Sequence, residues 1–253
     1  MIILYLSQSL TLMLHKTKGI ILHQIKYTDS GVIVQVYTRD FGRQSILIKG
    51  LRSRKSGKHN VVFQPMFILD LIFYYRESRE IQLLKDFSVS HSPSDIYADI
   101  KKSCTAVFLA EILASVLKEE SPNFELFDYI EDSIKYLDRC GAGYANFHIA
   151  FLIGLSSFLG FEPGKRDDPE KIYFDLQNGT FVNLPPLHSA YADPHVSDIL
   201  AEFFKVSFDQ MRSIPLTGSQ RDEVLETIIR YFSIHLPGLK KINSLEILKE
   251  IFI

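Results

Sequence analysis

From about Lys18 to Val89 the chain alternates apolar and polar residues with the two-residue period of β-strands. Segments rich in Ile, Val, Phe and Tyr, separated by turn residues, predict strands at 19–27, 32–38, 44–49, 66–75 and 81–89. The connectors at 28–31 and 39–42 are typical of hairpins, whereas residues 50–62 form a longer connection. Five short strands in about 70 residues predict a small closed barrel, most commonly an OB-fold, because closure removes exposed strand edges.

Beyond residue 91 the apolar period changes to that of helices, predicted at 95–118, 124–139, 144–160, 194–205, 220–235 and 244–252. Ser219 and Asn243 each precede an acid by three residues, as capping residues at helix starts do. Two stripes at helical spacing are assigned to the core: Ile96, Ile100, Phe108 and Ile112, and Phe147, Phe151, Leu155 and Phe158. Cys104 falls in register with the first stripe and is assigned to packing.

A loop at 160–169 and a small hairpin at 173–176 and 180–182, around Asn178-Gly179, interrupt the helical run. The predicted fold class is therefore α+β in two domains. Residues 13–90 form a five-stranded OB-fold β-barrel, and residues 91–253 form a mainly α-helical domain with a β-hairpin insertion near 161–190. Residues 1–12 are an N-terminal extension, either loosely docked or a mis-assigned start, since Met13 offers an alternative beginning.

Charge is distributed unevenly along the chain. The net charge is −2, yet residues 13–90 hold 13 Lys and Arg against 6 Asp and Glu. No acid lies between Phe41 and Leu69, and this stretch contains six cations: Arg43, Lys49, Arg52, Arg54, Lys55 and Lys58.

A charge run is usually only a solvated loop. Here it sits on a predicted OB barrel, whose exposed face and loops bind oligonucleotides, so we predict phosphate contacts with little sequence preference. Aromatic residues could add stacking surface, although strand alternation sends about half of them inward: Phe41, Phe63, Phe67, Phe73, Tyr74 and Tyr75. The alternative is a protein-interaction adaptor whose basic loop binds an acidic partner.

Catalytic and metal chemistry find little support. Cys104 and Cys140 are the only cysteines, which excludes a four-cysteine zinc site and a disulfide framework and fits a reducing cytoplasm. His188 and His195 flank Asp193 but lack the one-turn spacing of a helical ligand pair. No HExxH, GxSxG, P-loop or GxGxxG motif occurs, and no apolar run long enough for a membrane anchor, so we expect neither an enzyme nor a membrane protein.

The helical part is acidic but has local cations at Lys101, Lys102 and Arg139, and the sequence alone does not show whether they converge on a partner groove.

Several segments, taken in order, carry a resemblance. Gly19-Ile20-Ile21-Leu22, the run Tyr27 to Thr38, Gly42, Lys49-Gly50-Leu51-Arg52 with Lys55-Ser56, and Phe63-Gln64-Pro65 lie in the N-terminal part. Ala110-Glu111-Ile112-Leu113, Leu159-Gly160-Phe161-Glu162-Pro163, Tyr231 to Gly238 and Ser244-Leu245 follow. Over residues 13–253 the chain resembles the RecO family of bacterial recombination mediators.

The resemblance implies an OB-fold followed by a helical domain, binding to single- and double-stranded DNA, and strand annealing without ATP. It also implies partnership with RecR and the single-strand-binding protein SSB in loading RecA, and a cytoplasmic, nucleoid-associated location. Many RecO-like proteins carry four zinc-binding cysteines after the Gly-Phe-x-Pro turn, but residues 173–182 here contain none. We therefore expect no zinc, and a hairpin held instead by packing of Phe174 and Phe181.

Overall fold

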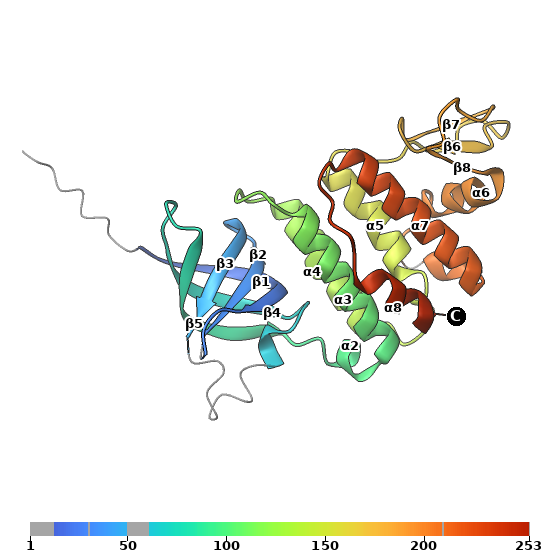
Figure 1. Ribbon diagram of the computed structural model, residues 1–253. Helices are drawn as coiled ribbons and strands as arrows, with labels where there is room; N and C mark the ends of the chain where they lie inside the picture. The colour runs from blue at the N-terminus through green and yellow to red at the C-terminus, as the bar shows by residue number, and fades with distance from the viewer. Residues whose placement is uncertain (1–12, 30, 50–60, 209, 253) are drawn as a thin grey trace, which may run out of the picture. The chain divides into compact units, whose positions relative to one another are not determined.

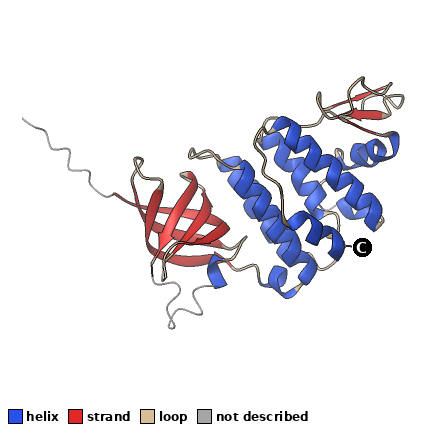
Figure 2. Ribbon diagram, in the orientation of Figure 1, coloured by secondary structure: helices blue, strands red, loops and turns tan. Residues whose placement is uncertain are grey.

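The computed structural model describes residues 13–29, 31–49, 61–208 and 210–252. These residues form two compact units (Figures 1 and 2). The first ends at Ser92 and also contains Glu119–Asn123, and the second comprises Pro93–Lys118 and Phe124–Ile253. Strands make up most of the first unit, and helices with one small sheet make up the second.

The first unit is a closed five-stranded barrel, which confirms the predicted OB-type fold. Its strands are β1 (Met13–Lys26), β2 (Val32–Thr38), β3 (Gly42–Ile48), β4 (Ile68–Tyr75) and β5 (Ile81–His91). They pair in the order β1-β2-β3-β5-β4, and β3 and β5 run parallel. A short 3-10 helix, η1 (Val61–Phe63), precedes β4.

Alternation along these strands explains the barrel core. In β3 every second residue is buried, so Gln44, Ile46 and Ile48 point inward while the residues between them are more exposed. The barrel interior is filled mainly by branched side chains and Phe73, which is 0% exposed. The alternating strand pattern therefore accounts for the apolar interior of the barrel. The largest boundary error is at β1, which begins at Met13 rather than residue 19, because residues 13–18 pair with β4.

The second unit contains α2 (Ser94–Ala98), α3 (Ile100–Val116), α4 (Phe124–Arg139), α5 (Phe147–Phe158), α6 (Pro194–Phe203), η2 (Met211–Ser213), α7 (Gly218–His235) and α8 (Ser244–Ile251). The helix predicted at 95–118 is in fact two helices. Asp99 adopts an extended backbone and caps α3 by accepting hydrogen bonds from the backbone N–H groups of Lys101 and Lys102. Ile100 is consequently 67% exposed, so its assignment to the core was wrong.

Both predicted helix caps differ from the observed ones. The capping residue of α7 is Thr217, which forms a reciprocal capping box with Gln220, so Ser219 already lies inside the helix. Asn243 precedes α8 but makes no side-chain cap. Instead, Glu111 of α3 accepts from the backbone N–H groups of Asn243 and Ser244, each at 2.9 Å. The N-terminus of α8 is thus capped by a residue distant in sequence.

The predicted hairpin is confirmed as β6 (Tyr173–Asp175) and β7 (Thr180–Val182), and β8 (Tyr191–Ala192) adds a third strand beside β6. Gly179 takes a positive φ of 65° in the turn. The rings of Phe174 and Phe181 lie 4.9 Å apart and both are buried, as predicted.

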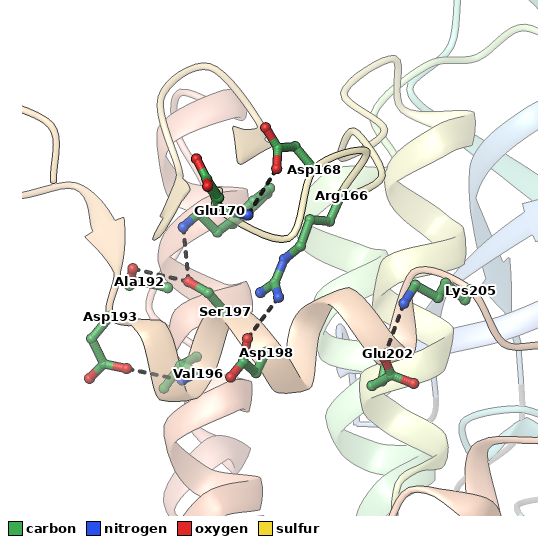
Figure 3. A network of polar contacts seen from close by, with 11 residues as sticks. Arg166, Asp168, Glu170, Ala192, Asp193, Val196, Ser197, Asp198, Glu202 and Lys205 are labelled. Atoms are coloured by element: carbon green, nitrogen blue, oxygen red, sulfur yellow. Dashed lines mark hydrogen bonds and ion pairs between the residues drawn. The ribbon is translucent and has the colours of Figure 1, made fainter. Parts of the chain in front are cut away.

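Polar contacts hold this small sheet against α6 (Figure 3). Ser197 accepts from the backbone N–H of Phe174 at 2.8 Å and donates to the carbonyl of Ala192 at 3.1 Å. Arg166 bonds Asp198 at 2.8 Å and lies over the ring of Phe181.

Candidate nucleic-acid interface

The basic connection between β3 and β4 is anchored at both of its ends. Lys49 directly follows β3 and is exposed. At the other end Phe63 is buried, with its ring 4.9 Å from that of Phe87 on β5. Four of the predicted phosphate contacts lie between these ends, outside the described residues: Arg52, Arg54, Lys55 and Lys58. One end of the connection therefore follows β3, and the other packs against β5, the parallel neighbour of β3.

Arg43 lies apart from Lys49. It stands near the start of β3, opposite Tyr37, and Lys49 follows the end of the same strand. Six residues of extended chain separate the two Cα atoms by about 20 Å. The backbone N–H of Arg43 donates to the carbonyl of Glu119 at 2.9 Å, and its side chain is half-buried. The structure therefore does not bring these two predicted contacts together.

Strand register brings two other lysines toward Lys49. Lys26 ends β1 opposite Val32, and Val32 in turn pairs with Ile48, the residue before Lys49. On the other side, Leu47 pairs with Leu83, so Lys49 and Lys85 each lie two residues beyond the last parallel pair. Lys26, Lys49 and Lys85 are all exposed. The charge pattern does not single out Lys26 and Lys85, because they lie 23 and 36 positions from Lys49 and only the pairing of distant strands brings them toward it.

A β-bulge contributes to the position of Lys85. Ile72 pairs with Asp86 and Phe73 with Leu84, which leaves Lys85 as the extra residue on β5. Bulges of this kind turn a side chain out of the regular alternation. The run of apolar and polar residues in the sequence contains no clear signal for this bulge.

The six candidate stacking residues divide equally between core and partial exposure. Phe63, Phe67 and Phe73 are at most 4% exposed and belong to the core. Phe41, Tyr74 and Tyr75 are half-buried, and the rings of Phe41 and Tyr75 lie 4.8 Å apart.

Acidic neighbours make the Phe41 and Tyr75 rings a poor place for DNA. Partial burial, followed by the carboxylates of Glu77 and Glu120, raises the pKa of Tyr75. The same negative charge opposes an approaching phosphate.

The cations noted in the helical unit do not converge. Lys102 is 4% exposed and donates to the carbonyl of Asp138 at 3.0 Å. Lys101 lies over the ring of Phe252, 5.5 Å from its centroid, while Arg139 is exposed at the end of α4. Because Lys102 is buried and hydrogen-bonded in the interior, these three residues do not form one anion-binding surface.

The histidine and aspartate candidates are also dispersed. Asp193 caps α6 by accepting from the N–H of Val196, and His188 faces Asp175 at 3.5 Å. His195 lies beside Gln220, and Asp167 pairs with Lys171 at 2.8 Å. Within the ranges that the structure describes, no group of three or more His, Cys, Asp or Glu residues could hold a metal ion. None of the described helices is both long and apolar enough to span a bilayer.

Comparison with known proteins matches both units to one family. Residues 13–93 match the family described as Recombination protein O N terminal, and residues 97–246 match Recombination protein O C terminal. The chain is 37% identical over 240 residues to the DNA repair protein RecO of Phocaeicola vulgatus, covering 95% of this chain and 100% of that protein. It is 38% identical over 242 residues to the DNA repair protein RecO of Bacteroides fragilis, with the same coverage. The RecO protein of Porphyromonas gingivalis is 30% identical over 240 residues, covering 93% of this chain and 98% of that protein.

Proposed function

Because the chain belongs to the RecO family of DNA repair proteins, we propose that it binds single- and double-stranded DNA and anneals complementary strands without enzymatic activity of its own. The observation that supports this most directly is the closed OB-type barrel with a six-cation, acid-free stretch attached to β3. OB barrels bind nucleic acid through such loops and faces.

Phosphate contacts from the barrel give annealing a physical basis. The proposed contacts are Arg43, Lys49, Arg52, Arg54, Lys55 and Lys58. Cations that neutralise the backbones of two strands lower their mutual repulsion. Contacts to phosphate leave the base edges free, so that the bases can pair with each other.

The family resemblance adds proposed partners. The helical unit docks RecR and SSB, and with them the protein helps to load RecA in the cytoplasm, at the nucleoid. Mixing the purified proteins and measuring co-elution tests this part separately from DNA binding.

Oligonucleotide titration at several salt concentrations tests the DNA proposal. If three or four cations contact single-strand phosphates, log affinity should fall against log salt with a slope of about −2 to −3. A charge-reversal set at Arg52, Arg54 and Lys55, with folding checked by circular dichroism, should weaken binding and annealing together. Absence of binding by the unaltered protein even at low salt would favour the adaptor alternative, and retained affinity in the charge-reversal set would move the DNA site elsewhere.

We also propose that the protein carries no structural zinc. The hairpin at 173–182 has no cysteine, and the rings of Phe174 and Phe181 pack against each other across it. These residues therefore do not fit the family's zinc site. Elemental analysis of the purified protein should find well below one zinc per chain, and a stoichiometric amount would overturn the proposal.

A further inference from the structure

Tyr27 is an exposed aromatic residue at one end of the barrel. Among the described residues of the first unit it is the only Phe or Tyr that is mostly exposed, at 56%. A closed turn fixes its backbone: the N–H groups of Tyr27 and Thr28 both donate to the carbonyl of Gly31 at 3.1 Å. The N–H of Gly31 donates back to the Thr28 hydroxyl at 2.7 Å. The ring is thus presented on a backbone that is already ordered.

Tyr27 lies at the same end of the barrel as the lysine cluster. It follows Lys26 directly, and the pairs Lys26–Val32 and Val32–Ile48 align this end of β1 with Lys49. On the parallel strand β5, Lys85 lies two residues beyond Leu83, just as Lys49 lies two residues beyond its partner Leu47. Adjacent strands are about 4.8 Å apart, so Lys26 and Lys49, on β1 and just after β3, are separated by about 10 Å across the sheet.

Two carboxylates belong to the same region. Asp29 lies in the turn after Tyr27, and Asp86 follows Lys85; both are exposed. The three lysines exceed these two acids. The net charge of these five residues is therefore positive, as binding of a phosphate backbone requires.

Resting on the proposed DNA-binding function, we propose that Tyr27 stacks on an unpaired DNA base while Lys26, Lys49 and Lys85 hold the flanking phosphates. A tyrosine ring offers a flat apolar face to any base, so the contact is sequence-tolerant. In a duplex both faces of each base are already covered by neighbouring pairs. Tyr27 consequently favours single strands over duplex, whereas the lysines serve both.

Tyrosine variants test the stacking contact. Tyr27→Ala should weaken binding of a labelled oligothymidine by about 5-fold or more, whereas Tyr27→Phe should bind like the unaltered protein. Binding of a duplex of equal length should change little. With an oligonucleotide whose bases are replaced by abasic sites, the effect of Tyr27→Ala should disappear because no base remains to stack. An equal loss on abasic DNA, or no loss on oligothymidine, would overturn the proposal.

Lysine variants test the phosphate contacts. Lys26→Ala and Lys85→Ala should each reduce the salt slope for single strands by about 0.7. Lys241→Ala is the matched control, because Lys241 is an exposed lysine of the helical unit, between α7 and α8, and is not among the proposed contacts.

The outcomes separate two failures. If the unaltered protein binds no oligonucleotide at low salt, the proposed function itself fails. If it binds while Lys26→Ala, Lys85→Ala and Tyr27→Ala match Lys241→Ala in affinity and slope, only this inference fails. Thermal melting of each variant confirms that folding is intact.

Discussion

The barrel and the helical unit differ in where their lysine and arginine side chains lie: among the described residues, only the helical unit buries any of them. Lys26, Lys49 and Lys85 are exposed on the barrel. In the helical unit Lys102 and Arg221 are only 4% and 8% exposed. Arg221 donates to the Asn146 side chain at 3.1 Å and to the carbonyls of Leu216 and Phe252 at 3.1 and 3.2 Å. Two cations of the helical unit thus complete its interior, whereas no described lysine or arginine of the barrel is buried.

This difference shows that the number of charged residues is a poor guide to function unless the burial of each side chain is known. Buried cations satisfy carbonyl groups that would otherwise lose their hydrogen bonds to water, so their loss destabilises the fold. Exposed cations contribute little to stability and remain available to a polyanion. Stability and DNA affinity should therefore respond to different residues.

The largest expected loss of stability follows from replacing Arg221. Arg221→Leu leaves three acceptors in or near the interior without their donor and should lower the free energy of unfolding by about 3–5 kcal/mol. Urea unfolding measures this loss. Lys26→Ala should stay within about 0.5 kcal/mol of the unaltered protein, since it removes an exposed side chain. Similar losses for both variants would break the distinction between the two units.

The next largest expected effect is a loss of stability at low pH through His148, a buried residue of the helical unit. Burial, with a further contribution from nearby Arg221, lowers the pKa of His148 to about 3 from its ordinary value of 6.5. Between these values the unfolded chain takes up a proton that the folded protein excludes, so stability falls as the pH drops below 6.5. By pH 4.5 the loss from this residue should reach about 2–3 kcal/mol.

His148→Phe should flatten this part of the pH dependence in urea unfolding at pH 7 and pH 4.5. The exposed His195 provides the matched control, and His195→Phe should leave the profile unchanged. A profile for His148→Phe as steep as that of the unaltered protein would contradict the assignment.

The smallest expected loss of stability follows from removing the cap at the start of α8. Glu111→Gln should cost about 1 kcal/mol at pH 7, because it removes the charge that accepts hydrogen bonds from Asn243 and Ser244. Partial burial alone would raise the pKa of Glu111, but these hydrogen bonds outweigh it and lower the pKa. Its contribution is therefore present above the ordinary pKa and is lost as the pH falls through the lowered value. Thermal melting at pH 7 measures the cost, with Glu250→Gln as an exposed control; equal melting temperatures for both variants would refute the capping role.

Local patterns predicted most elements correctly, and the exceptions have tertiary causes. The apolar stripe around Ile100 runs without a break in the sequence, yet Asp99 ends one helix and caps the next. The cap of α8 comes from Glu111, a residue 132 positions before Asn243, so no local motif could predict it. The rings of Phe161 and His235 stack with their centroids 5.3 Å apart, and the Tyr231 hydroxyl donates a hydrogen bond to the Phe161 carbonyl at 2.7 Å. These three residues belong to the segments that carry the family resemblance, and the contacts give them a structural role.

The sequence by itself determined the strand and helix periods, the acid-free basic stretch and the resemblance to one family, because these depend on neighbours along the chain. Only the tertiary structure decided which cations share a surface. Strand register brings Lys26 and Lys85 to Lys49 and leaves Arg43 at the far end of β3. Register arises from long-range pairing and closure of the barrel, which a linear pattern does not encode.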